Sequence, residues 1–298
     1  MPFWKIDLIL LAFLSRSRIY VTAEEWIQTE LWFNNNQHQD CGKFLEAIIS
    51  ELPFWKDLSN ISTTAWQQQR EQILASMEMG IRFCLRDDLP EHSMLKHLND
   101  PPRCLSFWGD LHSLWNHQAL AVVGSREASS ELLIWLDREL SVLLSARPDL
   151  IIVSGGARGV DQRAHFTAIK TKTPTVVWLP SGLLRPYPPE VQKWKQLVLE
   201  LGGCFVSEYH PLEEVKKWYF RQRNRLIIGM SQACFVPQSR YRSGSWMSAT
   251  LAAEMGVPVF TTTALPWDKH FSGNTRLLQD GAYCLFSSQD LIDFFMKR

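Results

Sequence analysis

The chain has 298 residues, which is long enough for one large domain or two domains of ordinary size. Hydrophobic residues make up 46% of it and charged residues 21%, close to the average of a globular protein, which argues against an intrinsically disordered chain. The formal net charge is +0, which excludes a protein that binds polyanions through its bulk charge. Any nucleic-acid site must therefore be a local patch of arginine and lysine.

The cysteines and the N-terminus place the chain among cytoplasmic proteins. Six cysteines stand at positions 41, 84, 104, 204, 234 and 284, with no Cys-x-x-Cys pair and no histidine at metal-ligand spacing. We expect no metal site and no disulfide framework, and we interpret most of these cysteines as small buried residues. The apolar stretch 6–14 is interrupted by Asp7 and is much shorter than a membrane span, so a buried helix and no membrane partner are predicted.

Residues 1–78 show helical periodicity with scattered tryptophans and carry no catalytic or binding motif. A helix is predicted over 65–79. We interpret this part as a small helical N-terminal domain in which the tryptophans are core residues, since large aromatic side chains dominate buried area. Base stacking is the alternative for some of them.

From residue 79 to residue 298, short apolar runs alternate with longer helical segments. The predicted strands are 81–85, 104–107, 120–123, 150–153, 175–179, 204–206, 234–236, 258–260 and 283–286. The predicted helices are 130–145, 160–170, 190–201, 218–230, 245–255, 275–280 and 288–296. This alternation predicts an α/β fold with a doubly wound, mostly parallel sheet.

Ligands of such a sheet bind outside the carboxyl ends of the strands, so the residues after each strand are candidates. Five strand ends carry glycines, hydroxyls or arginines, in segments 124–126, 154–161, 180–183, 243–245 and 272–274. Glycines let backbone N–H groups approach a phosphate, and Arg126 and Arg158 can add charge-assisted hydrogen bonds. One such loop has a purely steric explanation, but five at one edge predict an anion site.

The densest basic run, 216–225, interleaves cations with aromatic side chains. Cations in the first turn of a helix oppose the helix dipole, which points to an anionic partner. A base stacked on Phe220 or Tyr219, with phosphates on neighbouring cations, would be typical of single-strand binding. The alternative is a solvated basic first turn.

Enzymatic interpretations are weaker. Asp161 and His165 share a helix face and could form a catalytic pair, but a carboxylate near a helix N-terminus and a half-buried histidine explain them as well, and we favour that interpretation. Neither a P-loop nor a Gly-x-Ser-x-Gly elbow occurs. Asp161 and Glu208 are the only acids expected near the anion-binding edge. We therefore predict no catalytic residue, no metal ligand and no cofactor.

Taken in order, the motifs from about residue 88 to residue 285 resemble the DprA/Smf family of DNA-processing proteins. They include Gly124-Ser125-Arg126, Ser154-Gly155-Gly156-Ala157-Arg158-Gly159, Phe220-x-x-Arg223-Asn224-Arg225, Ser243-Gly244-Ser245 and Gly273-Asn274. So many ordered motifs at compatible spacing are more specific than any single glycine loop. One departure is Gln238, which stands where an acidic residue is common.

The resemblance implies an extended Rossmann domain that binds single-stranded DNA, protects incoming DNA in natural transformation, helps to load the RecA recombinase and forms a homodimer. In this interpretation Arg158 holds a phosphate, while Lys217 and Phe220 make the neighbouring phosphate and base contacts. The predicted DNA-binding residues are Gly124, Ser125, Arg126, Ser154, Gly155, Arg158, Lys217, Phe220, Arg223, Asn224, Ser243, Gly244 and Asn274.

Two alternatives use the same phosphate loops. One is a small-nucleotide sensor. The other is an enzyme of the lysine-decarboxylase-like Rossmann group that cleaves a nucleotide N-glycosidic bond, although the Pro-Gly-Gly-x-Gly-Thr run of that group does not occur here.

Overall fold

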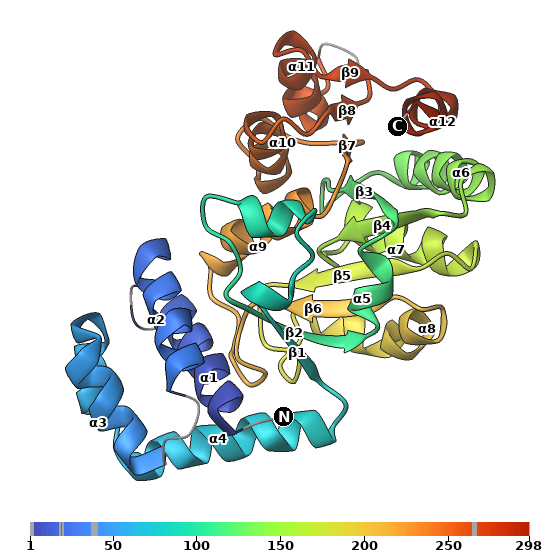
Figure 1. The fold of residues 1–298 in the computed structure, drawn as a ribbon. Coiled ribbons are helices and arrows are strands. Elements are labelled where there is room, and N and C mark those ends of the chain that lie inside the picture. The colour runs from blue at the N-terminus through green and yellow to red at the C-terminus, as the bar shows by residue number, and fades with distance from the viewer. Residues whose placement is uncertain (1–2, 18, 20, 37–40, 264–266, 298) are drawn as a thin grey trace.

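The computed structural model describes residues 3–17, 19, 21–36, 41–263 and 267–297 (Figure 1). The N-terminal part is helical, with α1 (Phe3–Ser17), α2 (Ala23–Asn35), α3 (Cys41–Glu51), the 3-10 helix η1 (Pro53–Asn60) and α4 (Thr63–Glu78). A capping box begins α2, because the Thr22 hydroxyl accepts from the Glu25 backbone N–H and the Glu25 carboxylate accepts from the Thr22 N–H.

The helix predicted over 6–14 is confirmed as part of α1, which is buried along most of its length. Its one acidic residue, Asp7, accepts a 2.8 Å hydrogen bond from the Trp66 indole, so the charge interrupts the apolar run without being left unpaired. Trp26, Trp55 and Trp66 are fully buried, which confirms that these tryptophans are core residues.

A nine-stranded sheet follows. Its strands are β1 (Arg82–Leu85), β2 (Cys104–Gly109), β3 (Gln118–Val122), β4 (Leu150–Ser154), β5 (Thr175–Leu179), β6 (Cys204–Ser207), β7 (Ala233–Val236), β8 (Val259–Thr261) and β9 (Tyr283–Cys284). The spatial order is β1-β2-β6-β5-β4-β3-β7-β8-β9. The β1–β2 and β2–β6 pairs are antiparallel and all other pairs are parallel. The predicted α/β class, with its mostly parallel sheet, is confirmed.

Helices cover both faces of this sheet (Figure 1). One face carries α6 (Ser130–Ala146), α7 (Val160–Lys170), α8 (Lys195–Glu200) and α12 (Ser288–Met296). The other carries α9 (Tyr219–Gly229), α10 (Gly244–Glu254) and α11 (Ser272–Gln279). The short elements are α5 (Leu111–Leu114) and the 3-10 helices η2 (Arg86–Asp88), η3 (Met94–His97), η4 (Pro189–Trp194) and η5 (Lys269–Phe271). The helix predicted over 190–201 is therefore a 3-10 turn followed by a shorter α-helix, since Pro189 opens the segment.

The buried cysteines behave as expected. Cys84, Cys104, Cys204 and Cys234 are buried free thiols, and Cys284 is half-buried, while the side chain of Cys41 lies outside the described residues. Burial raises the pKa of the Cys84 thiol to about 12, which keeps it protonated and unreactive. Among the described residues, no helix is long and apolar enough to cross a membrane, and no group of three or more His, Cys, Asp or Glu side chains could hold a metal ion.

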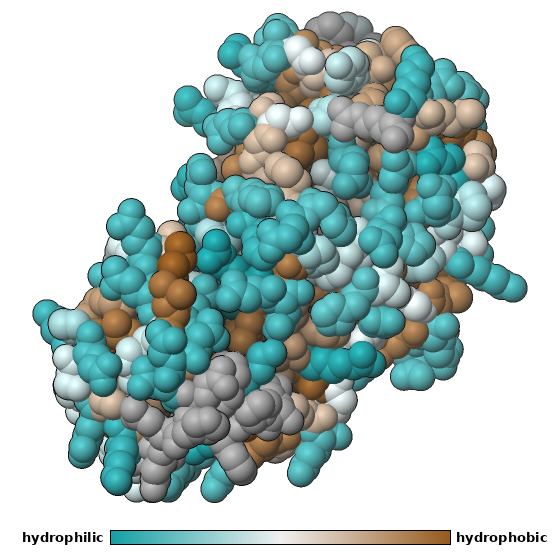
Figure 2. Space-filling view, in the orientation of Figure 1, coloured by the Kyte–Doolittle hydropathy of each residue, from teal (hydrophilic) through white to brown (hydrophobic). Residues whose placement is uncertain are grey.

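The N-terminal helices pack at the β1–β2 edge of the sheet, far from β9 (Figure 1). Their apolar core continues into the sheet through Leu85 and Cys104. On the outer side, Figure 2 shows a hydrophobic strip over α2, where Ile27 and Leu31 are exposed. The division of the chain at residue 78 stays a prediction.

A buried ion network joins the N-terminal helices to the sheet. Arg16 of α1 donates to the Asp100 carboxylate at 2.7 Å and to the Glu208 carboxylate at 2.7 Å. Arg225 of α9 donates to the same Glu208 oxygen at 2.5 Å. The Glu208 side chain is only 2% exposed, so this carboxylate depends on both arginines for its charge compensation.

We expect Arg16→Met to lower the free energy of unfolding by about 3 kcal/mol, because the change leaves the buried Glu208 carboxylate with one partner fewer. Lys5→Met is the matched control on the same helix: Lys5 and Asp88 form an exposed pair at 3.3 Å, and its loss should cost less than about 1 kcal/mol. Chemical denaturation measures both. Equal losses for the two variants would show that the network does not stabilise the contact between the N-terminal helices and the sheet.

Candidate nucleic-acid interface

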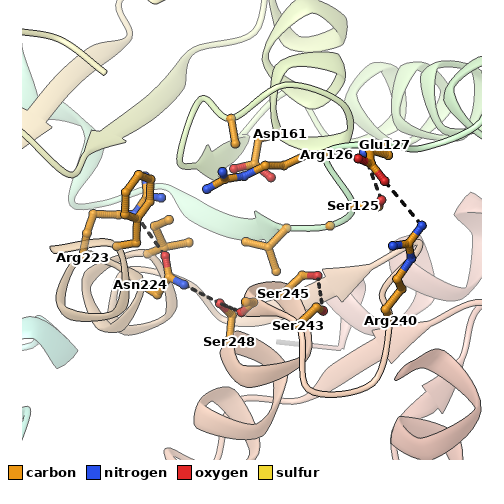
Figure 3. A pocket seen from close by; sticks show the side chains of 16 residues that line it. Ser125, Arg126, Glu127, Asp161, Arg223, Asn224, Arg240, Ser243, Ser245 and Ser248 are labelled. Atoms are coloured by element: carbon orange, nitrogen blue, oxygen red, sulfur yellow. Dashed lines mark hydrogen bonds and ion pairs between the residues drawn. The ribbon is translucent and has the colours of Figure 1, made fainter. Parts of the chain in front are cut away.

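A pocket of about 350 Å³ opens where the strand order reverses, between β3 and β7. This is the switch point at which doubly wound sheets bind ligands, because the loops after β3 and β7 diverge to opposite faces there. The loop after β3 contributes segment 124–127, and the loop after β4 contributes Ala157 and Asp161. Helix α9 forms one wall, and the loop after β7 with the start of α10 forms the opposite wall (Figure 3).

Eight of the thirteen predicted residues line this pocket: Gly124, Ser125, Arg126, Phe220, Arg223, Asn224, Ser243 and Gly244. The fold therefore brings together predicted residues that are up to 120 positions apart in the chain. Ser154, Gly155, Arg158, Lys217 and Asn274 do not line it. The loops after β5 and β8 also stay outside, so three of the five predicted strand ends converge on one pocket.

The loops that build the pocket are tied to each other through their backbones. The Val160 N–H donates to the Ser125 carbonyl at 3.2 Å, and the Ser125 N–H donates to the Gln238 carbonyl at 2.9 Å. Gly159 makes the first contact possible, because its φ is +82° and an added Cβ would lie 2.3 Å from the Ser125 carbonyl oxygen. Gly159 thus serves the approach of one loop to another.

Arg223 holds α9 against the ends of β4 and β5. Its side chain is buried, and its Nη1 donates to the Gly155 carbonyl at 2.9 Å and to the Trp178 carbonyl. Burial lowers the pKa of Arg223 to about 10, partly offset by the charge of Asp161. Burial raises the pKa of the Asp161 carboxyl, while Arg223 and hydrogen bonds from nearby groups act to lower it.

The structure gives a different reason for a glycine at position 155 from the one predicted from the sequence. An added Cβ would lie 2.2 Å from Arg223 Nη1, so the glycine makes room for a buried guanidinium and not for a phosphate. Ser154 and Asn274 are likewise fully buried. The Ser154 hydroxyl donates to the Val122 carbonyl at 2.6 Å, and the Asn274 amide oxygen accepts from the Ser239 N–H at 2.7 Å. Both side chains therefore tie loops to strand ends in the interior of the protein.

An aromatic and a cationic group stand together at the wall formed by α9. The Arg126 guanidinium lies over the Phe220 ring, 5.2 Å from its centre, and Tyr187 meets the same ring edge-on at 5.6 Å. Phe220 is half-buried, and both Arg126 and Tyr187 are exposed. A nucleobase could take the place of the guanidinium on the ring face, with the arginine free to bind a phosphate.

The basic run 216–225 is less available than its sequence indicates. Lys216 pairs with Glu213 at 2.5 Å, Arg223 is buried, and Arg225 belongs to the ion network with Glu208. Tyr219 is fully buried and stacked on Tyr209 at 3.8 Å, so the expectation that it stacks on a base is wrong. Lys217 and Arg221 are the cations of this run that stay exposed. Three of the five cations of the run are thus paired or buried: Lys216 with the nearby Glu213, Arg225 with Glu208, and Arg223 in the interior.

The structure supports the structural interpretation of Asp161 and His165. His165 is fully buried, its Nδ1 lies 2.8 Å from the Thr175 hydroxyl, and its ring packs on Trp194. Burial lowers the pKa of His165 to about 3, so the imidazole is neutral and cannot exchange protons at neutral pH.

Three pocket residues escaped the sequence analysis. Arg240 and Glu127 line opposite sides of the opening and form an ion pair at 3.4 Å, and Ser248 accepts a hydrogen bond from the Asn224 amide at 2.8 Å (Figure 3). The expectation that only Asp161 and Glu208 lie near this edge is therefore wrong, because Glu127 is in the pocket and Glu208 is not. Arg240 could have been predicted from the sequence, because it lies four residues after β7, in a loop at the carboxyl end of a strand.

Fold and site together define a Rossmann-like protein with an arginine-lined pocket at its switch point. Comparisons with known proteins agree. The family model described as DNA recombination-mediator protein A matches residues 82–296. The DNA processing protein DprA of Bacillus subtilis is 30% identical over 207 residues, which cover 68% of each chain. Protein Smf of Borreliella burgdorferi is 33% identical over 263 residues, covering 87% of this chain and 81% of the relative.

Two solved structures share both fold and sequence similarity. DprA from Streptococcus pneumoniae superposes with a TM-score of 0.72 at 25% identity over 98% of each chain. DprA from Helicobacter pylori, whose structure reports a single-stranded DNA binding mode, superposes with a TM-score of 0.63 at 29% identity, covering 72% of this chain and 96% of that one. The chain belongs to the DNA recombination-mediator protein A family, and the resemblance to DprA/Smf proteins is confirmed.

Two glycine substitutions separate the framework of the pocket from its lining. Gly159→Ala should lower the melting temperature and abolish ligand binding, because the methyl group collides with a carbonyl and the residue has positive φ. Gly244→Ala should keep the melting temperature, since an added Cβ at Gly244 meets nothing within 4 Å. Thermal unfolding of both variants is the measurement, and an unchanged melting temperature for Gly159→Ala would contradict the loop contact.

His165 predicts a pH dependence of stability. Its folded-state pKa of about 3 lies below the ordinary value of 6.5, so the unfolded chain takes up a proton first as the pH falls. The contribution of His165 to the free energy of unfolding should therefore be complete above pH 6.5. Below pH 6.5 it should decrease by up to about 1.4 kcal/mol per pH unit. Denaturation between pH 6.5 and pH 5 should show a flatter profile for His165→Gln than for wild type. Parallel profiles would mean that His165 is not buried neutral.

Proposed function

We propose that this chain binds single-stranded DNA with little sequence preference in the pocket between β3 and β7, and that it acts there as a recombination mediator. The observation that carries the proposal is the juxtaposition of an accessible aromatic ring, Phe220, with exposed arginines on the surrounding loops. Stacking on an aromatic ring and ion pairing with the backbone are the two interactions that bind single strands irrespective of sequence. The DNA-binding relative from Helicobacter pylori supports it.

Single strands suit this pocket better than duplex does. The faces of bases in a duplex are covered by their neighbours, so stacking on Phe220 would require unpairing and unstacking, at a cost of a few kcal/mol. Arg126 and Arg240 line the pocket, and Arg158 lies on the loop after β4 beside it. Because these arginines come from three different loops, they can follow a flexible chain more readily than a rigid helix.

The residues near the pocket favour a binding protein over an enzyme. Phosphoryl transfer and glycosidic cleavage both need a positioned acid or base that can act on the ligand. The two acids of the pocket lining are both paired with arginines: Asp161 is buried beside Arg223, and the Glu127 carboxylate lies 3.4 Å from Arg240. In keeping with the family, we propose that the protein protects incoming DNA in the cytoplasm, helps to load a RecA-type recombinase and acts as a homodimer, with residues 1–78 as a separate helical domain.

The first test is a titration with a short oligothymidylate, with the same sequence as a duplex, and with thymidine monophosphate. We expect the single strand to bind more tightly than the other two, with log affinity falling linearly with log salt by about 0.7 for each phosphate contacted. Tightest binding of the mononucleotide would favour a nucleotide sensor. Preference for the duplex, or binding that does not depend on salt, would contradict the proposal.

Arg158→Ala should weaken binding of single strands of any sequence and reduce the salt slope by about 0.7, because it removes one phosphate contact. The variant should fold normally, since the Arg158 side chain is 73% exposed. Lys170→Ala is the matched control: Lys170 is an exposed cation paired with Asp137, at the end of α7 and thus at the opposite edge of the sheet. Normal binding by a folded Arg158→Ala protein would show that Arg158 does not contact a phosphate of the bound strand.

A further inference from the structure

The loops that build the pocket carry three exposed arginines, and each already has a partner within the protein. Arg126 lies over the Phe220 ring, Arg158 pairs with Glu190, and Arg240 pairs with Glu127. Two of the three guanidinium groups that could bind DNA phosphates, those of Arg158 and Arg240, are thus paired with carboxylates before any ligand arrives.

The Arg158–Glu190 pair lies outside the pocket lining, near Tyr187, whose ring contacts Phe220. Arg158 Nη2 donates to Glu190 Oε1, and this hydrogen bond lowers the pKa of the Glu190 carboxyl, so the glutamate is ionised at neutral pH. Arg158 follows Ala157, which lines the pocket, and Glu190 is the second residue of η4, in a separate segment. The pair is therefore a contact between two loops and not a local helix pair.

The Arg240–Glu127 pair spans the opposite end of the opening. Arg240 Nη2 lies 3.4 Å from Glu127 Oε2 (Figure 3). The same nitrogen lies 3.1 Å from His270 Nδ1. Both members of the pair line the pocket, and both are exposed, with side-chain exposures of 53% and 78%. The Ser125 hydroxyl accepts from the Glu127 backbone N–H at 3.1 Å, which holds the glutamate's backbone on the pocket side of the β3 loop.

We propose that Glu127 and Glu190 are built-in competitors of the ligand: they occupy the phosphate-binding faces of Arg240 and Arg158 in the free protein, and the backbone of a bound single strand displaces them. This inference rests on the proposed function and adds that two carboxylates of the chain itself set the affinity of the site.

The chemistry of the two anions supports the exchange. A carboxylate and a phosphate both accept from the same guanidinium N–H groups, so they cannot bind one face of an arginine together. Exposed ion pairs contribute little to stability, so the displacement costs little. A lone phosphate only replaces one anion by another, whereas a strand replaces both glutamates and adds stacking on Phe220, which favours polynucleotides over isolated anions.

The test compares binding of a short oligothymidylate by wild type, Glu190→Gln and Glu127→Gln, using fluorescence anisotropy. Each substitution should raise the affinity about two- to fivefold, the range expected when one exposed ion pair no longer competes. Glu200→Gln is the matched control, because Glu200 is an exposed glutamate at the end of α8, near the opposite edge of the sheet. Its affinity should equal that of wild type.

Double-mutant cycles show whether the gain acts through the paired arginine. Glu190→Gln should bring no gain in an Arg158→Ala background, and Glu127→Gln should bring none in an Arg240→Ala background. An unchanged affinity in the single glutamine variants would overturn the inference, and so would an equal gain in the arginine-free backgrounds, because that would be a general charge effect. Absence of binding by wild type would overturn the proposed function and this inference with it.

Discussion

The buried guanidinium of Arg223 is the interaction on which the pocket depends. It joins α9 to the carbonyl groups of Gly155 and Trp178, at the ends of two central strands. Because α9 also carries Phe220 and Asn224, this contact sets the distance between the wall of the pocket and the glycine loop after β4. A buried cation is costly unless its donors are satisfied, so the chain must bring these elements together in this one arrangement.

The ion network around Glu208 links the same helix, α9, to the N-terminal helices. Arg225 lies two positions after Arg223 on α9, and through Glu208 it is linked to Arg16 of α1. Helix α9 is thus joined to the sheet through Arg223, and to the N-terminal helices through Arg225 and Glu208. The N-terminal part, which carries no binding motif of its own, is in contact with the helix that forms the pocket wall.

The pocket combines fixed and replaceable interactions. The hydrogen bonds of Ser154, Asn274 and Arg223 are buried, so they define the framework. The contacts of Arg126, Arg158 and Arg240 are exposed, so water and ligands compete for them. Such a division suits a protein that binds a flexible polyanion without reading its sequence, because the exposed cations can follow the backbone while the framework stays in place.

The sequence alone predicted most of the strands and helices, the mostly parallel sheet and five loops at the carboxyl ends of strands, because periodicity and glycine placement are local properties. The strand order, and which three of the five loops meet at the switch point, came from the tertiary structure. The motif resemblance added the site residues. Only the tertiary structure decided which of these residues face the pocket. Gly155 and Asn274 are buried and support the loops, and Glu127 and Arg240 joined the residues that line the pocket, because the partner of a charged or buried polar group is set by contacts between distant segments, which no local pattern contains.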